Sequence, residues 1–334
     1  MSATPRQVVL AARPDAIPQA EHFEIREAPA PEPAEGEFRV RTTHLSIDPA
    51  MRGWVSAVAN YAEPVAIGAP MRSIAMGEVE ASRHPDFDEG SVLCGMFGWQ
   101  ELAVSDGSDV WFRHDRAHGD PSLSLGVLGI NGITAYHALL DVGRPVEGDT
   151  VVVSTAAGGV GSAVGQIAKL KGCRTVGIAG GAEKTKACLE DFGYDAAIDY
   201  KSEDVGKALD AACPEGVNVY YDNTAGPISD AVYARLAPKA RCVVCGTASI
   251  SSWDPWPTGP RIERHVLVKR ASIAGFLLFD YVDRFDEARN ALCGWLSEGR
   301  LTWKEHVLEG LEAAPGAISM LYRGENRGNL VVKL

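Results

Sequence analysis

The chain of 334 residues carries 32 Lys and Arg against 44 Asp and Glu, a net charge of −12, with 46% hydrophobic and 23% charged residues, as expected for a globular protein of two domains. Because an acidic surface repels phosphate backbones, this charge disfavours nucleic acids and anionic membranes as partners. No apolar run is long enough to span a bilayer, no signal-peptide core opens the chain and its seven cysteines show no disulfide spacing, so we predict a cytoplasmic protein.

The first 120 or so residues are predicted to be rich in strands and loops. Short apolar or alternating runs are separated by Pro and Gly, a spacing typical of a barrel or sandwich. The runs are 7–14 (QVVLAARP), 23–29 (FEIREAP), 38–47 (FRVRTTHLSI), 73–82 (SIAMGEVEAS) and 91–104 (SVLCGMFGWQELAV).

Strands and helices alternate from about residue 123 onward. A helical pattern at 125–143 comes first, and such alternation predicts a doubly wound parallel sheet of the α/β class. The expected strands are Thr150–Ser154, Thr175–Ala179, Ala196–Ile198, Val217–Tyr221, Arg241–Cys245 and Ser272–Leu278. The expected helices between and after them lie at 162–172, 183–193, 204–213, 228–238 and 284–299. The β-like tail 328–334 is a candidate to return to the N-terminal sheet.

A glycine-rich turn, TAAGGVG at 155–161, links the first of these strands to a helical pattern. Glycine lets the backbone approach a pyrophosphate, and the start of a helix offers free N–H groups. Because strand, turn and helix come in this order, the turn predicts a dinucleotide site at Gly158, Gly159, Val160 and Gly161. The alternative is an ordinary tight turn.

The end of the second strand indicates which dinucleotide is bound. NAD-binding proteins carry a carboxylate about 20 residues after the glycines, but this chain has Ala179, Gly180 and Gly181 there. A carboxylate would repel a 2′-phosphate, whereas Lys184 would neutralise one, with the neighbouring Glu183 expected to point elsewhere on the helix. We therefore predict NADP(H). The alternative is that the lysines here form a solvated helix face.

Eight segments occur in the order found in a known family: LSIDPAMRG (45–53), NGITAYHALLDVG (131–143), STAAGGVGSAVGQIAKLKGC (154–173), VGIAGGAEK (176–184), GYDAAIDYK (193–201), VNVYYDNTAG (217–226), GFLLFDY (275–281) and GENRGNLVVK (324–333). On the basis of these segments, the chain resembles the zinc-independent medium-chain dehydrogenase/reductase superfamily. Within it, the chain is most similar to the branch of prostaglandin/leukotriene reductases and alkenal double-bond reductases. The resemblance covers nearly the whole chain.

The resemblance implies a cofactor site made of individual residues. Lys184 and Tyr200 match residues near the 2′-phosphate, Asn223 matches an asparagine beside the nicotinamide half, and Phe276 lies in the segment that passes the nicotinamide. The full implied set is Gly158, Gly159, Val160, Gly161, Gly180, Lys184, Tyr200, Asn223, Phe276 and Asn326.

The resemblance also implies the architecture. A GroES-like, β-barrel-type substrate domain is expected at 1–122 with 300–334, a Rossmann dinucleotide-binding domain at 123–299, and a homodimer. The chain departs from the family at Ala50, where many relatives carry Tyr, and at Ser251, which stands about where a substrate-facing tyrosine is expected. Substrate preference therefore does not carry over.

No metal site is predicted. Cys242 and Cys245 lie in an apolar strand and are expected to be small buried hydrophobic residues. The cluster His114, Asp115, His118 and Asp120 has ligand-like spacing but is better explained as a solvated loop.

The expected chemistry is NADPH-dependent reduction of the carbon–carbon double bond of α,β-unsaturated aldehydes and ketones, with hydride transfer to the β-carbon. A hydroxyl donor would stabilise the enolate oxygen, and water or a tyrosine would protonate the α-carbon. The catalytic candidates are Tyr61, Tyr281 and Arg52. The alternative for each tyrosine is a packing role with a satisfied hydroxyl. Arg52 either orients the cofactor or pairs with a surface acid.

A Pro- and Trp-rich loop at 251–265 (SSWDPWPTGPRIERH) follows a strand end. Trp253 and Trp256 either cap the substrate or pack at a subunit contact. Two other functions stay open: a quinone reductase of the same superfamily, and a non-catalytic NADPH-binding protein.

Overall fold

The computed structural model describes residues 4–57, 61–250 and 255–334. The chain divides into two compact units, Met1–Gly126 with Glu305–Asn326 and Leu330–Leu334, and Val127–Lys304 with Arg327–Asn329. We call them unit 1 and unit 2 and describe each by itself. The domain boundaries expected from the sequence, at 122/123 and 299/300, fall a few residues from these limits and stay a prediction.

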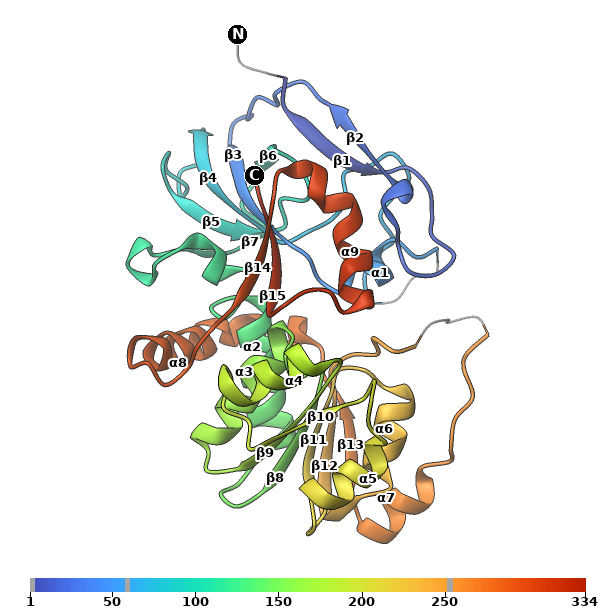
Figure 1. Ribbon diagram of the computed structural model, residues 1–334. Helices are drawn as coiled ribbons and strands as arrows, with labels where there is room; N and C mark the ends of the chain where they lie inside the picture. The colour runs from blue at the N-terminus through green and yellow to red at the C-terminus, as the bar shows by residue number, and fades with distance from the viewer. Residues whose placement is uncertain (1–3, 58–60, 251–254) are drawn as a thin grey trace. The chain divides into compact units, whose positions relative to one another are not determined.

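Unit 1 is built on antiparallel strands. Strands β1 (Arg6–Leu10) and β2 (Phe23–Glu27) pair with each other, and a larger sheet has the order β14-β15-β3-β4-β5-β7, with β6 also paired to β3. The strands of this sheet are β3 (Phe38–Ser46), β4 (Ala75–Ser82), β5 (Val92–Gly95), β6 (Leu102–Ser105), β7 (Val110–Arg113), β14 (Glu305–Glu309) and β15 (Asn329–Lys333). Helices α1 (Met51–Trp54) and α9 (Ala314–Arg323) accompany it (Figure 1).

The C-terminal strand joins the N-terminal sheet, as the apolar tail suggested. Val331 pairs with Ser46 and Lys333 with His44, antiparallel. The pairing is favourable because β15 buries Leu330, Val331 and Val332 in the core of unit 1.

Unit 2 is a parallel sheet with the order β10-β9-β8-β11-β12-β13, with helices packed against it (Figure 1). Its strands are β8 (Thr150–Ser154), β9 (Arg174–Ala179), β10 (Ala196–Asp199), β11 (Val217–Asp222), β12 (Leu236–Val244) and β13 (Ser272–Gly275). Its helices are α2 (Ile130–His137), α3 (Gly159–Leu170), α4 (Ala182–Glu190), α5 (Val205–Ala212), α6 (Gly226–Tyr233), α7 (Glu263–Lys269) and α8 (Phe285–Ser297). All five residues of β8 are buried, as a strand covered on both faces requires. The predicted α/β class with a doubly wound parallel sheet is confirmed.

Several elements differ from the expectation. The strand predicted at 272–278 ends at Gly275, and β12 begins at Leu236, before the predicted start at Arg241. Helix α7 occupies the end of the stretch predicted to be a loop, and α9, β7 and β14 had not been predicted.

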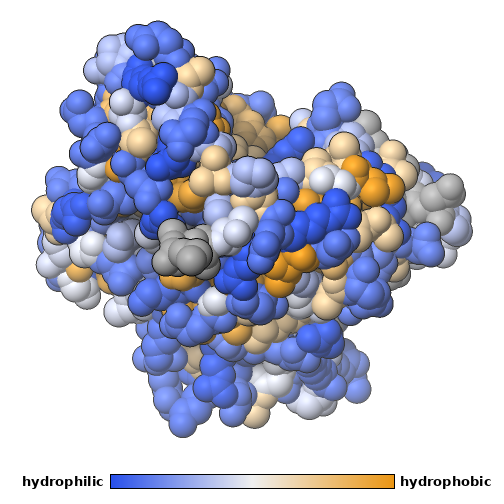
Figure 2. Space-filling model, turned by 90° about the horizontal axis from the view of Figure 1, so that it is seen from above, coloured by the Kyte–Doolittle hydropathy of each residue, from blue (hydrophilic) through white to orange (hydrophobic). Residues whose placement is uncertain are grey.

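The surface seen in Figure 2 is mostly hydrophilic, as expected for a chain with 23% charged residues. Figure 2 shows one face of the molecule, on which hydrophilic residues predominate and hydrophobic residues form small groups. Within the described residues, no helix is both long and apolar enough to span a membrane.

Candidate functional site

The glycine-rich turn between β8 and α3 is too tightly packed for side chains. A Cβ on Gly161 would lie 2.3 Å from the backbone oxygen of Thr155. Gly158 precedes α3 and offers no side chain to cap its N–H groups. The first turn of this twelve-residue helix therefore presents backbone donors and the positive end of a helix dipole.

The ends of β9 and β10 form a second feature of the same sheet edge. The Tyr200 ring covers Gly180, where a Cβ would lie 2.8 Å from the ring and hydroxyl atoms. The N–H of Gly181 donates to Asp199 Oδ1 at 2.7 Å, and the N–H of Lys201 donates to the same oxygen at 3.0 Å. Asp199 therefore ties the two loops together.

Lys184 lies in the first turn of α4 beside these loops. Its side chain is half-buried, and burial lowers the pKa of its ammonium, which the nearby charge of Lys201 lowers further. In the described part of the chain neither lysine is ion-paired with a carboxylate; Glu183 pairs with Arg327 instead. The charge of Lys201 lowers the pKa of the Asp199 carboxyl, so Lys201 is partly balanced, whereas Lys184 has no carboxylate within ion-pair distance in the described part of the chain and suits an anionic ligand.

The loop after β11 is fixed by a buried carboxylate. Asp222 is 1% exposed and accepts bonds from the N–H groups of Thr224 and Ala225, at 2.9 and 2.8 Å, and from Ser229 Oγ at 2.6 Å. Asn223 follows Asp222 directly in this loop, and its side-chain amide donates to the backbone oxygen of Ser154 at 2.7 Å. The predicted nicotinamide-side residue is thus held at the end of β8.

Phe276 and Tyr281 belong to one aromatic group. Their ring centroids are 5.0 Å apart, and Tyr281 also stacks on the buried ring of His137 at 4.9 Å. His137 is fixed in turn by Asp141 Oδ2, 2.9 Å from its Nδ1. Tyr281 therefore makes the packing contacts expected if it is a structural residue. These contacts also fix the position of the segment that carries Phe276 and Tyr281.

The candidates in unit 1 lie around α1. Arg52 is buried, and its guanidinium lies 5.6 Å from the centroid of the Tyr322 ring, whose hydroxyl donates to Pro49 O at 3.1 Å. Asp48 is also buried and accepts a bond from Ser46 Oγ at 2.6 Å. Burial raises the pKa of the Asp48 carboxyl to about 6.

Tyr61 is half-exposed as a residue, but desolvation raises the pKa of its hydroxyl, an effect that Trp54 opposes and the charge of Asp48 reinforces. The raised pKa makes this hydroxyl harder to ionise than an ordinary tyrosine hydroxyl, which is itself protonated at neutral pH. Asn326, also in unit 1, is 7% exposed.

The cysteine and histidine groups have structural surroundings. Cys242 is buried, and Cys245 accepts a bond from the Tyr221 hydroxyl at 3.4 Å. Burial raises the thiol pKa values to about 12 and about 11. His114 Nδ1 lies 2.8 Å from Ser124 Oγ. Across the described residues, no group of three or more His, Cys, Asp or Glu is placed to hold a metal ion.

The Trp-rich loop is only partly described. Trp256 is 70% exposed. Trp253 and Ser251 lie outside the described residues.

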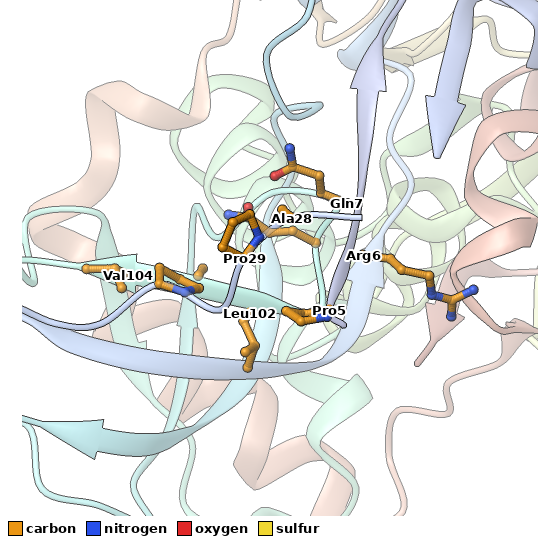
Figure 3. Close-up of a pocket in the computed structure, with 10 residues that line it drawn as sticks. Pro5, Arg6, Gln7, Ala28, Pro29, Leu102 and Val104 are labelled. Atoms are coloured by element: carbon orange, nitrogen blue, oxygen red, sulfur yellow. The ribbon is translucent and has the colours of Figure 1, made fainter. Parts of the chain in front are cut away.

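A pocket of about 210 Å³ lies elsewhere in unit 1, at β1 and β6 (Figure 3). Its lining consists largely of prolines, aliphatic side chains and amides, and its one charged residue, Arg6, is paired with Glu101 at 2.8 Å. Catalytic chemistry needs a reactive group that this lining does not offer.

Some residues of these features were missed at the sequence level. Asp199 and Lys201 flank the predicted Tyr200, and the rule that neighbouring parallel strands end at one sheet edge would have drawn attention to them. Asp222 directly precedes the predicted Asn223.

Known proteins resemble the chain over its full length. A sequence model described as "N-terminal domain of oxidoreductase" matches residues 6–112, and one described as "Zinc-binding dehydrogenase" matches residues 159–293. "NADPH-dependent curcumin reductase" of Escherichia coli is 41% identical, with 98% of this chain and 96% of that protein covered. "2-alkenal reductase (NADP(+)-dependent)" of Nicotiana tabacum is 36% identical, with 88% and 86% covered. The crystal structure of CurA from Vibrio vulnificus in complex with NADPH is 42% identical, covers 98% of both chains and has a TM-score of 0.93.

Proposed function

The chain belongs to the zinc-independent medium-chain dehydrogenase/reductase superfamily, in the branch of the prostaglandin and alkenal double-bond reductases, and from this premise we propose that it is an NADPH-dependent reductase of activated carbon–carbon double bonds. The substrates would be α,β-unsaturated aldehydes and ketones. The relatives support this class, since one is named a 2-alkenal reductase and another a curcumin reductase.

The observation that carries the cofactor assignment is the environment of Lys184. This half-buried ammonium has Lys201 nearby and no carboxylate partner in the described part of the chain, so an additional phosphate on the adenosine ribose would satisfy it. A 2′-phosphate is the group that distinguishes NADP(H) from NAD(H).

Other residues of unit 2 would hold the rest of the cofactor. The turn at Gly158, Gly159, Val160 and Gly161 leaves backbone N–H groups open for a diphosphate. Tyr200 and Gly180 would border the adenosine end, and Asn223 and Phe276 the nicotinamide end. From unit 1, we assign Asn326 a cofactor contact and Arg52 an orienting role.

When bound, NADPH would supply the hydride for the β-carbon. Negative charge then develops on the substrate carbonyl oxygen, and a hydroxyl donor directed at that oxygen stabilises the enolate. We assign this donor to Tyr61, because it matches a tyrosine that lines the pocket in some double-bond reductases and because a tyrosine hydroxyl carries its proton at neutral pH. Tyr281 is the second candidate. Water or a tyrosine would return a proton to the α-carbon.

We also propose a homodimer that uses the edge of the sheet in unit 2. Strand β13 lies at that edge in the described sheet, and exposed edge strands are ready to pair with another chain. Near it, α7 exposes Leu267 at 76% and Val268 at 53%, apolar surface that a second copy would cover. A reducing, cytoplasmic setting is part of the proposal and is supported by the burial of most of the free thiols.

The test is an absorbance assay of NADPH oxidation with enals, enones, quinones and simple aldehydes, with NADH run beside NADPH. We expect turnover of enals and enones, with a strong preference for NADPH. Faster turnover of quinones would favour the quinone reductase function. Tight NADPH binding without turnover of any acceptor would favour a non-catalytic protein. Efficient use of NADH would overturn the role of Lys184.

A further inference from the structure

The side-chain amide nitrogen of Asn329 is a buried donor without an acceptor in the described part of the chain. Asn329 is 3% exposed, and its Oδ1 accepts a bond from Asn131 Nδ2 at 2.7 Å. Its backbone N–H donates to Lys304 O at 3.0 Å, which leaves Nδ2 as the unsatisfied group. A buried donor without a partner destabilises the folded state, so its presence points to a group that binds there.

This donor is held at the glycine-rich turn. The carboxamide of Asn131 lies against the first residue of α3, since a Cβ on Gly159 would be 3.1 Å from Asn131 Nδ2. The residue before Asn329 is held there as well: Gly328 forms a parallel bridge with Gly158 and donates to Ala157 O at 3.2 Å. Segments that are 198 residues apart in the sequence thus meet where α3 begins.

The start of α3 is suited to an anion. The helix has twelve residues, Gly158 at its N-cap position supplies no side-chain cap, and the helix dipole favours negative charge at this end. Two independent features therefore indicate the same ligand: uncapped backbone N–H groups, and a buried amide donor beside them.

We infer that Asn329 Nδ2 donates a hydrogen bond to the diphosphate of the bound dinucleotide, with Asn131 as the residue that positions it. This inference rests on the proposed dinucleotide site, but it concerns the diphosphate, which NAD(H) and NADP(H) share, and not the 2′-phosphate that Lys184 would recognise.

The test is Asn329→Asp, measured by calorimetric titration of the whole protein with ADP-ribose and with 2′-phospho-ADP-ribose. The substitution keeps the oxygen that accepts from Asn131 and replaces only the unsatisfied donor, by a carboxylate oxygen that repels a diphosphate. Asn218→Asp is the matched control, because Asn218 Oδ1 accepts from the N–H of Thr150 at 2.9 Å, at the opposite end of β8 from the glycine-rich turn.

We expect Asn329→Asp to weaken both ligands by about tenfold or more, as expected for loss of a charge-assisted hydrogen bond, and Asn218→Asp to stay within about twofold of the wild type. Equal ADP-ribose affinity in wild type and Asn329→Asp would overturn the inference and leave the proposed function intact. Failure of the wild type to bind either ligand would overturn both. Equal affinity of the wild type for ADP-ribose and 2′-phospho-ADP-ribose would contradict the role of Lys184 in 2′-phosphate recognition and would leave the Asn329 inference standing. If Asn329→Asp does not fold, Asn329→Ala removes the same donor without adding charge, and its ADP-ribose affinity decides in the same way.

Discussion

The Tyr200 ring lies against Gly180 so closely that a Cβ on Gly180 would come within 2.8 Å of the ring and hydroxyl atoms. Tyr200 is 44% exposed, so the ring can swing toward solvent when this space is filled. Gly180→Ala should therefore change the free energy of unfolding by less than about 1 kcal/mol but displace Tyr200 from the proposed 2′-phosphate site. We expect the NADP⁺ dissociation constant to rise several-fold while that of NAD⁺ changes little. An equal loss of affinity for NADP⁺ and NAD⁺ would indicate a general distortion of the loop and would contradict a specific role of Tyr200 at the 2′-phosphate.

Lys184 gives a prediction about pH. Burial and the charge of Lys201 lower its pKa, so it loses its proton at a lower pH than an ordinary lysine, whose pKa is about 10.4. NADP⁺ affinity should be full at neutral pH and decline on the alkaline side before that ordinary value. Lys184→Arg should retain affinity to higher pH because an arginine stays charged.

The measurement is the dissociation constant of NADP⁺ and of NAD⁺ between neutral and alkaline pH. Lys186→Arg is the control, since Lys186 lies on the same helix but pairs with Glu190 at 3.7 Å. A decline that is the same for NAD⁺, or that persists in Lys184→Arg, would rule out Lys184 as the titrating group.

The periodic elements of unit 2 could be predicted from the sequence because their signals are local. The buried strand at β8, the glycine turn and the helical spacing of α3 lie within about 20 consecutive residues. The short α9 was missed although Pro315 in its first turn and Gly324 in a left-handed conformation at its end are typical helix-boundary signals.

The contacts that shape the candidate site could not be predicted in this way. Asn131 meets Asn329 across 198 residues, and Arg327 pairs with Glu183 across 144 residues. No pattern within a local window relates such residues, because their proximity depends on the sheet order. The neighbourhood of Lys184, by contrast, could have been predicted from the rule that adjacent parallel strands end at one sheet edge, although Asp199 and Lys201 were not named from the sequence.

Asp48 provides a prediction about stability. Burial raises its pKa from 3.8 to about 6, so the folded state holds its proton more tightly than the unfolded state. Stability is therefore lost as the pH rises from about 4 to about 6, and the loss levels off above that at about 3 kcal/mol for a shift of roughly two units. Asp48→Asn removes this penalty.

The free energy of unfolding, measured by urea unfolding at pH 4.5 and pH 7.5, should be higher for Asp48→Asn than for the wild type, and the difference should be larger at pH 7.5. Asp88→Asn, at an exposed carboxylate of the same unit, serves as the control and should show no such gain. If the two proteins keep a constant difference at both pH values, the Asp48 carboxyl does not titrate in this range.

The backbone of the glycine-rich turn gives the last prediction. A Cβ on Gly161 would lie 2.3 Å from Thr155 O and 2.9 Å from Ala156 Cα, and backbone atoms cannot move aside as a side chain can. Gly161→Ala should therefore destabilise the protein by about 1–3 kcal/mol and weaken ADP-ribose binding, because the turn must open to accept it. Gly294 offers the matched control, since it lies within α8 and has no atom within 4 Å of an added Cβ. Gly294→Ala should stabilise the protein by up to about 1 kcal/mol without changing affinity. A Gly161→Ala protein as stable as the wild type, measured by thermal unfolding, would show that the turn tolerates a side chain and that its glycines are not required by packing.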